Sequence, residues 1–375
     1  MPQCGPFRRP ARRRRAAAAP RPPRRDPRWH HLPPRPPHRR APRRPRPAPR
    51  LPPSVSGAPH LLVVCGPTAT GKTPLAVAVA ERLGAVELVN ADSRQVIRGL
   101  VVGTCAPTAA ELRGVPCHLL AVRDPGEPFT VAAWLRLARP AVEDIDRRGA
   151  LPLVVGGTGF YIGALVDGLD LAGVEPDPVT REWRFALAER PEGLSELAAE
   201  LSRRDPAGAA GVDRRNPRRV VRALEILDAH GTLAARGRSG GLPATLLALD
   251  APAELHRRLV EERSRRLLGD GALLAEVEAA LARGVGRSAL DAAGIGYREA
   301  LAVLDGVADV DGAVDLLVRR TLRYAKAQRT WFRRDRRIRW LERDARPVDR
   351  LAGEVIDVLH QDARTGERLP GGRRP

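Results

Sequence analysis

Lysine is nearly absent from this sequence. Only two of its 64 basic residues are lysines, Lys72 and Lys326, and all the others are arginines. A lysine that persists in such a composition is a candidate for a site that needs a compact ammonium rather than a planar guanidinium. Lys72 and Lys326 are therefore candidates for basic residues with a specific function.

The sequence also lacks paired cysteines and long apolar runs. Its four cysteines (Cys4, Cys65, Cys105 and Cys117) form no C-x-x-C pair, which argues against a disulfide framework and against a zinc site. No run of 18 apolar residues is long enough for a membrane span, and no apolar stretch near the start has the length of a signal peptide. We therefore expect a soluble, cytoplasmic protein with no membrane partner.

Positive charge is concentrated in the first part of the chain. The net charge is +20, but residues 1–50 hold 17 arginines and one aspartate, so the remaining 325 residues carry only +4. Residues 1–58 alternate Pro, Arg and Ala with almost no apolar side chains to bury, so we expect a disordered Arg/Pro-rich leader. Two interpretations stay open: an arm that attracts RNA, or a poorly constrained leader, for instance one produced by a start codon assigned too early. Nucleic-acid binding by the rest of the chain must depend on local basic patches.

From residue 59 onward, apolar strand-like runs alternate with helix-like segments. The runs at 61–65, 85–90, 151–155 and 244–250 predict strands, and the segments 73–83 and 132–147 predict helices. This alternation is typical of an α/β fold with a parallel sheet. The predicted divisions are 59–169 as the first part of the α/β core, 170–235 as a helical insertion, 236–345 as core completion and a basic helical region, and 346–375 as a C-terminal helix and frayed tail.

A phosphate-binding motif follows the first predicted strand. Residues 66–73 read GPTATGKT and match the pattern G-x-x-x-x-G-K-[ST]. The backbone N–H groups of 68–73 are predicted to surround a diphosphate at the helix N-terminus. Lys72 would supply positive charge, and the Thr73 hydroxyl is the expected Mg²⁺ ligand. The motif alone does not say which phosphate compound binds.

Two further polar turns follow predicted strands, NADSRQ at 90–95 and GGTGFYI at 156–162. The carboxyl ends of parallel strands meet at one edge of a sheet, so the three turns are predicted to form one site. Asp92 has three open roles: metal ligand, general base, or N-cap of a following helix. The glycines of 156–159 indicate either close approach of the backbone to a ligand or a simple tight turn.

Two basic segments are candidate RNA surfaces. Arg218 and Arg222 lie four residues apart on one predicted helix face, with no nearby acid before Glu225. The second segment, 319–339, interleaves aromatic residues with ten basic residues and contains one acid, Asp335. The alternatives are a salt-bridged surface helix for the first segment and a basic helix with buried aromatics for the second. The ten basic residues are Arg319, Arg320, Arg323, Lys326, Arg329, Arg333, Arg334, Arg336, Arg337 and Arg339.

GPTATGKT, DSRQ and GGTGFY, in this order and spacing, resemble the tRNA dimethylallyltransferases, also called tRNA isopentenyltransferases. The resemblance extends over roughly residues 60–345. It implies a P-loop NTPase-like core and Mg²⁺-dependent transfer of a dimethylallyl group from dimethylallyl diphosphate to N6 of adenosine 37 in the tRNA anticodon loop. Further matching motifs are VPCHLL (115–120), DPGEPFTV (124–131), NPRRVVRALEI (216–226), GIGYREA (294–300) and RYAKAQRTWFRR (323–334).

The resemblance also implies roles for individual residues. Asp92 is the implied general base on N6, Thr73 takes part in catalysis, and Arg263 is the implied arginine beside the diphosphate, with a register that is open by a residue or two. The implied diphosphate-binding residues are Gly66, Pro67, Thr68, Ala69, Thr70, Gly71, Lys72 and Thr73. The implied tRNA contacts are Asp92, Ser93, Arg94, Gln95, Thr158, Arg181, Arg218, Arg219 and Arg222. We also expect adenosine 37 to be flipped out of its stack and the enzyme to be a monomer.

Three alternative functions are open: prenylation of free adenine nucleotides, a small-molecule kinase reaction, and RNA binding with a regulatory nucleotide. The two basic segments favour a tRNA acceptor over a free nucleotide or another small molecule. The sequence also departs from the usual pattern of the family at Ile97, Ala106 and Ala327. These departures affect expected substrate contacts more than the chemistry.

Overall fold

A computed structural model of the chain describes residues 59–169, 174, 177–233 and 240–365. The predicted leader 1–58 and the predicted frayed end 366–375 lie outside the described residues. Among the described helices, none is both long enough and apolar enough to cross a membrane.

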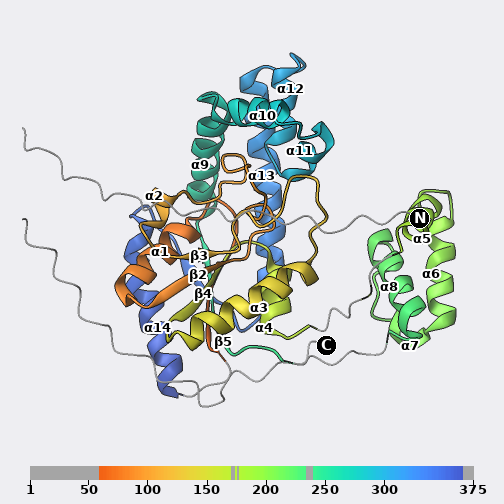
Figure 1. The fold of residues 1–375 in the computed structure, drawn as a ribbon, viewed down its shortest axis with the longest axis horizontal. Coiled ribbons are helices and arrows are strands. Elements are labelled where there is room, and N and C mark those ends of the chain that lie inside the picture. Colours follow the sequence, from red (N-terminus) through yellow and green to blue (C-terminus); the bar gives the residue numbers. More distant parts are fainter. Residues whose placement is uncertain (1–58, 170–173, 175–176, 234–239, 366–375) are drawn as a thin grey trace, which may run out of the picture. The chain divides into compact units, whose positions relative to one another are not determined.

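Six parallel strands form one sheet at the centre of the fold (Figure 1). Their order is β3-β2-β4-β1-β5-β6, so β1 lies between β4 and β5. The four predicted strands are confirmed, whereas the two short strands at the sheet edges were not predicted. The strands are β1 (Leu61–Cys65), β2 (Val86–Asn90), β3 (Cys117–His118), β4 (Leu151–Val155), β5 (Ala244–Asp250) and β6 (Arg339–Glu342).

Helices cover both faces of this sheet. Successive side chains of β1 point to opposite faces: Leu62 and Val64 pack with α1 (Lys72–Leu83) and α14 (Ala352–Thr365). Leu61, Val63 and Cys65 pack on the other face, with α3 (Val131–Arg147) and α4 (Gly159–Val166). Burial of β1 on both faces explains why it reads as a continuous apolar run rather than an alternating one. The fold is therefore α/β and of the P-loop type.

Residues 178–230 form four helices with a hydrophobic core of their own. Leu201 and Leu224 are fully buried in this core, which lies among α6 and α8 and is joined by side chains of α5. The helices are α5 (Pro178–Ala188), α6 (Gly193–Arg204), α7 (Pro206–Ala209) and α8 (Pro217–His230). All-helical structure is what the sequence predicts here.

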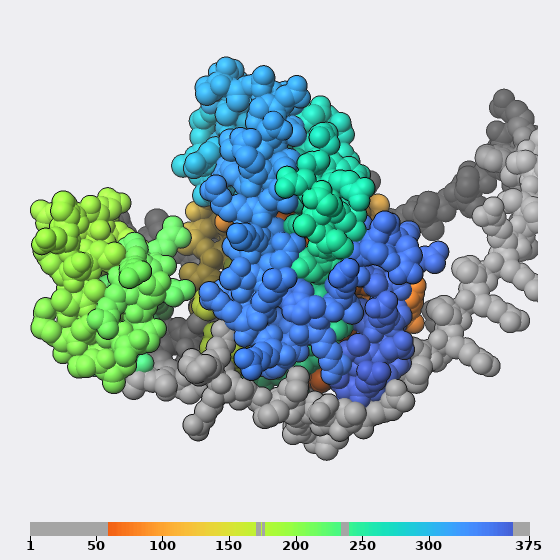
Figure 2. All heavy atoms as spheres, turned by 180° about the vertical axis from the view of Figure 1, so that it is seen from behind, coloured from red at the N-terminus to blue at the C-terminus, as the bar shows by residue number. Residues whose placement is uncertain are grey.

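A second group of helices follows β5, and the longest of them is α13 (Val310–Phe332). It contacts α9, α12 and α4, and its exposed side faces the viewer in Figure 2. The basic segment 319–339 is helical up to Phe332 and ends in strand β6, because residues from Arg339 onward pair with β5. The remaining elements are α2 (Ala109–Leu112), α9 (Ala253–Ser264), the π-helical turn η1 (Arg265–Gly269), α10 (Ala272–Ala282), α11 (Arg287–Ala293), α12 (Tyr297–Leu304) and the 3-10 turn η2 (Val348–Leu351).

Candidate active site at the carboxyl edge of the sheet

The loop between β1 and α1 has the tight backbone that the phosphate-binding motif predicts. Gly66 has a φ of 127°, and a Cβ at this position would lie 2.4 Å from the Leu249 carbonyl oxygen of the neighbouring strand. Gly71 has a φ of 93°. Ala69 has a φ of 63°, a left-handed conformation that costs a non-glycine residue about 1–2 kcal/mol. The loop therefore holds strain that the surrounding contacts must offset.

Lys72 lies at the start of α1 with its ammonium turned back onto this loop. Its Nζ donates to the Pro67 carbonyl oxygen at 2.6 Å. Desolvation lowers the pKa of Lys72 to about 8, while the charge of Asp92 opposes this shift and that of Arg263 adds to it. A bound anion would favour the charged ammonium, so the environment of Lys72 is suited to a phosphate group.

Thr73 fits the expected role of a magnesium ligand. It is half-buried in the first turn of α1, and no residue in the described ranges hydrogen-bonds to its hydroxyl. The described residues contain no cluster of three or more His, Cys, Asp or Glu that could hold a metal ion. Mg²⁺ is commonly held by one or two protein oxygens together with substrate phosphates and water, and the Thr73 hydroxyl could supply one such oxygen.

Thr68 is held by three side chains from distant elements. Its N–H donates to Gln328 Oε1 at 2.8 Å, its carbonyl oxygen accepts from His256 Nε2 at 2.9 Å, and its hydroxyl accepts from Arg263 Nη1 at 3.1 Å. Gln328 therefore occupies the Thr68 N–H in this structure, and the expected role of this N–H in the phosphate cradle stays a prediction.

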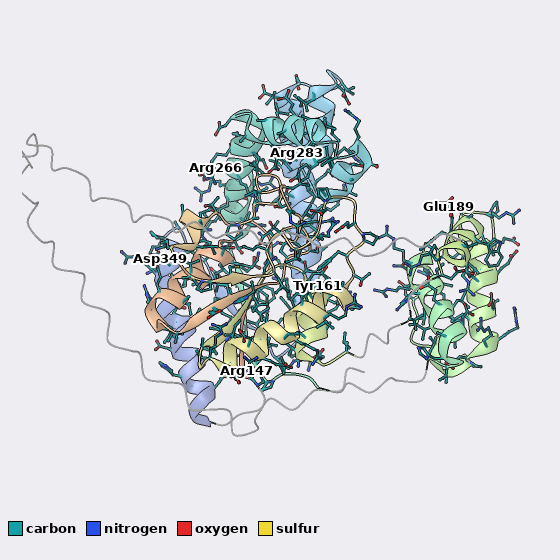
Figure 3. The ribbon with its side chains drawn as sticks, viewed as in Figure 1. Arg147, Tyr161, Glu189, Arg266, Arg283 and Asp349 are labelled. Carbon is teal, nitrogen blue, oxygen red and sulfur yellow. The ribbon has the colours of Figure 1, made fainter. Side chains whose placement is uncertain are left out.

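Among the neighbouring arginines of this stretch, Arg263 donates a hydrogen bond to the phosphate-binding loop. Arg263 is half-buried in the last turn of α9 and points at the loop. Arg265 and Arg266 are exposed in turn η1, and Arg266 Nη2 lies 4.0 Å from Glu262 Oε1 of α9 (Figure 3). Arg263 is thus the arginine of this stretch that reaches the loop through a hydrogen bond.

Asp92 lies in a sharp turn after β2. Its Oδ1 accepts from the Arg94 N–H at 2.8 Å, and its own N–H donates to Asn90 Oδ1 at 3.1 Å. Residues 93–96 form turns and no helix begins there, so the N-cap role is wrong. The carboxylate interacts electrostatically with Lys72, and the two residues follow strands that both flank β4 at the same edge of the sheet.

The GGTG turn packs tightly against protein neighbours. A Cβ on Gly156 would lie 2.2 Å from the Ala91 carbonyl oxygen, and one on Gly157 would lie 2.3 Å from Gln328 Nε2. Thr158 Oγ1 accepts from the Ser93 N–H at 2.9 Å, which joins this turn to the DSRQ turn. The glycines are thus required for close approach by protein atoms, which a simple tight turn would not need.

Several residues that support these turns were not predicted from the sequence. Trp134 Nε1 donates to the Asn90 carbonyl oxygen at 3.0 Å, and the Trp134 ring stacks on Tyr161 with centroids 4.8 Å apart. Glu276 accepts from the N–H groups of residues 101–103 and from the Tyr297 hydroxyl. The presence of Tyr161 and Tyr297 in matched motifs was the available signal, because the sequence has only three tyrosines.

Other predicted tRNA contacts near the site already have protein partners. Arg94 Nη1 donates to the Ala292 carbonyl oxygen at 2.7 Å, and Gln95 Nε2 donates to the Cys105 carbonyl oxygen at 2.9 Å. These bonds fix the shape of the DSRQ turn whether or not the side chains also contact RNA.

The arginines of the helical insertion that are predicted to contact tRNA are less available for such contacts than the sequence indicated, because most of them pair with acids. Glu225 is buried and receives two hydrogen bonds from Arg181, at 2.6 and 2.8 Å, and one from Arg222 at 3.1 Å. Burial opposes ionisation of Glu225, but these two guanidinium groups hold its pKa below the usual value. Arg219 lies 3.6 Å from Asp213. The expectation of an unopposed arginine row is therefore wrong, and Arg218 is the exposed member for which no described residue provides a carboxylate.

Segment 319–339 is also partly neutralised by acids from elsewhere. Arg329 pairs with Asp250, Arg320 with Glu299, and Arg339 with Asp362, none of which is adjacent in sequence. Arg337 pairs with both Asp167 and Asp335. The exposed basic residues that remain on or just after α13 are Arg319, Arg323, Lys326, Arg333, Arg334 and Arg336.

Comparison with known proteins identifies the family. The model described as "IPP transferase" matches residues 95–335, which is more than half of the chain, and the "Isopentenyl transferase" model matches residues 59–124. A tRNA dimethylallyltransferase from Anaeromyxobacter dehalogenans is 45% identical over 289 residues, covering 75% of this chain and 94% of that protein. The chain belongs to the tRNA dimethylallyltransferase family.

Two further known proteins are similar to this chain over most of its length. A tRNA dimethylallyltransferase from Kineococcus radiotolerans is 40% identical over 313 residues, covering 80% of this chain and 96% of the relative. The crystal structure of the full-length tRNA isopentenylpyrophosphate transferase from Bacillus halodurans matches with a TM-score of 0.61 and 33% identity, covering 84% of this chain and 99% of that one. The predicted fold class, the family resemblance and the prenyltransferase activity are confirmed.

Proposed function

We propose that this enzyme transfers the dimethylallyl group of dimethylallyl diphosphate to N6 of adenosine 37 in tRNA and releases diphosphate. The observation that carries the proposal is the convergence of Asp92, Lys72 and Arg263 at one edge of the sheet, from three distant segments. A carboxylate beside a cationic phosphate-binding loop suits proton removal from an amine and departure of a diphosphate.

The proposed roles follow from the charges and the polar atoms. Asp92 accepts the proton that N6 loses as the new carbon–nitrogen bond forms. Lys72 and Arg263 neutralise the charge that develops on the departing diphosphate. Bound Mg²⁺ would supply further charge stabilisation to the diphosphate, and Thr73 is the protein ligand that we assign to it. Adenosine 37 must leave its stack to reach Asp92, so a flipped base is part of the proposal.

The function is tested by mixing the protein with dimethylallyl diphosphate, Mg²⁺ and an unmodified tRNA that carries A36-A37-A38. We expect prenylated adenosine at position 37, detected by mass spectrometry of the digested tRNA. AMP is the matched alternative acceptor. Product on AMP alone would favour prenylation of free nucleotides, and ADP formed from ATP with a small-molecule acceptor would favour a kinase.

We further propose that Arg218 contacts tRNA phosphates. Arg218→Ala should weaken tRNA binding about equally for all sequences and reduce the slope of log affinity against log salt by about one, since one phosphate contact is lost. Filter-binding titrations at several salt concentrations measure this slope. Arg147→Ala is the control, because Arg147 is an exposed arginine that pairs with Asp144 on α3 (Figure 3). An unchanged slope in the Arg218 variant would remove it from the tRNA surface.

A further inference from the structure

His256 is a buried histidine to which the proposed reaction assigns no role. It lies on α9, its side chain is 2% exposed, and its Nε2 is 2.9 Å from the Thr68 carbonyl oxygen in the phosphate-binding loop. Its Nδ1 is 3.2 Å from Arg329 Nη2. Arg329 in turn makes a bidentate contact with Asp250, with Nε 2.8 Å from Oδ2 and Nη2 2.8 Å from Oδ1.

The chemistry of these partners determines the protonation state of His256. A carbonyl oxygen only accepts hydrogen bonds, so Nε2 must carry a proton and donate it. A guanidinium only donates, so Nδ1 must be unprotonated and accept. The arrangement is therefore satisfied only by the neutral imidazole in its Nε2–H tautomer. Asp250 holds the Arg329 guanidinium in the orientation that selects this tautomer.

The orientation of the Thr68 carbonyl affects the next residue of the loop. A trans peptide is planar, so the Thr68 C=O and the Ala69 N–H point in opposite directions. Turning the carbonyl towards His256 therefore turns the Ala69 N–H away from α9. Ala69 is also the residue that adopts the unfavourable left-handed conformation in this loop. A strained peptide of this kind persists only when neighbouring groups determine its orientation.

We propose that His256 is a positioning residue for the phosphate-binding loop, with Arg329 and Asp250 selecting the tautomer that holds the Thr68–Ala69 peptide in place. The proposal deepens the function proposed above, because the ligand of the loop is the diphosphate of the prenyl donor. His256 acts through the loop and does not contact the reacting atoms.

Titration of His256 should then disrupt the loop. Protonation would place an N–H at Nδ1 opposite the N–H of the Arg329 guanidinium. Because two donors cannot bond to each other, the neutral imidazole is favoured. The charged groups that face His256 are Arg329 from α13, Asp250 from β5 and Lys72 from α1. Burial, together with Arg329 and Lys72, lowers the pKa of His256 below its ordinary value of 6.5, although the Thr68 bond and Asp250 oppose the shift. The affinity for diphosphate should accordingly be unchanged at pH values above the lowered pKa of His256 and should weaken as the pH falls through it.

The test compares two substitutions of this residue. His256→Gln keeps one N–H donor and one acceptor but does not titrate, whereas His256→Leu removes both. We expect His256→Leu to raise the KM for dimethylallyl diphosphate on the order of tenfold, because it removes the hydrogen bond to the partly buried Thr68 carbonyl oxygen. The KM for tRNA should change little, and His256→Gln should restore most of the loss. His118→Gln is the matched control, since His118 pairs with Glu87 at the opposite edge strand of the sheet.

Pyrophosphate binding is also measured against pH for the unaltered protein, His256→Gln and Arg329→Gln. The dissociation constant of inorganic pyrophosphate, measured by calorimetry from pH 5 to 8.5, reports on the phosphate-binding loop even if no prenyl transfer occurs. Failure of this proposal can therefore be distinguished from failure of the proposed function. The unaltered protein should lose affinity at acid pH, and the Gln variant should lose less. Arg329→Gln removes the guanidinium that lowers the pKa of His256 and leaves Asp250, which raises it, so the loss of affinity should move to higher pH. This variant also provides a test if the Leu variant does not fold. The proposal would be overturned if the Gln and Leu variants bound diphosphate equally weakly, or if the Leu variant bound it as tightly as the unaltered protein. It would also be overturned if the Gln variant lost as much pyrophosphate affinity at acid pH as the unaltered protein.

Discussion

Replacing Asp92 with asparagine should remove most prenyl transfer while leaving tRNA binding close to that of the unaltered enzyme. Asparagine has nearly the same shape and can still accept the Arg94 N–H through its side-chain oxygen, so the turn after β2 should persist. It does not accept a proton from N6. Loss of a positioned base costs about 10²- to 10⁴-fold in rate.

The Asp92→Asn result is measured as single-turnover transfer with saturating enzyme, alongside tRNA binding in the same buffer. Asp349→Asn is the control, a change of the same chemistry in turn η2 (Figure 3). Transfer at the unaltered rate would exclude Asp92 as the base. A parallel loss of tRNA binding would instead assign Asp92 a role in holding the tRNA.

Replacing Lys72 with arginine should lower the rate of transfer about 10²- to 10³-fold, even though the positive charge is kept. The ammonium fits beneath the loop, 2.6 Å from the Pro67 carbonyl oxygen, beside Asp92 and Arg263. A planar guanidinium is larger and needs a wider arrangement of acceptors, so it would displace the loop rather than replace the ammonium.

The other lysine provides a matched control. Lys326 is exposed on α13, and Lys326→Arg should retain activity within about twofold, because exposed charges usually contribute little to stability or geometry. Steady-state transfer and pyrophosphate affinity for both variants test the pair. If Lys72→Arg is active, the interpretation of Lys72 from composition is wrong. If Lys326→Arg is strongly impaired, Lys326 has a specific contact with substrate.

Much of the candidate site was predictable because its chemistry lies in short motifs at strand ends. The buried strand 61–65 and the glycine pattern of 66–73 predict both a loop and its position, and parallel strands bring Asp92 and Thr158 to the same edge. Arg263 was predicted only through the family resemblance. The sequence itself left its register open among neighbouring arginines.

The missing predictions share a physical cause, which is pairing between residues far apart in sequence. Glu225 looked like the first acid beyond an arginine row, yet it is buried and hydrogen-bonded to both Arg181 and Arg222. His256 and Arg329 meet only because α9 and α13 pack together beside the loop. No spacing within a segment reveals such partners. The edge strand β6 was missed because a four-residue, half-exposed strand has almost no pattern.

The contact between Gly157 and Gln328 also constrains how this enzyme can change over evolutionary time. One amide side chain donates to the Gly157 carbonyl oxygen and accepts from the Thr68 N–H, so it ties two loops together at the point where a Cβ on Gly157 would collide with it. A substitution at either position alone loses a bond or creates a collision. Descendants of this sequence should therefore keep both residues or replace them together, and mutational paths that pass through a single change should be rare.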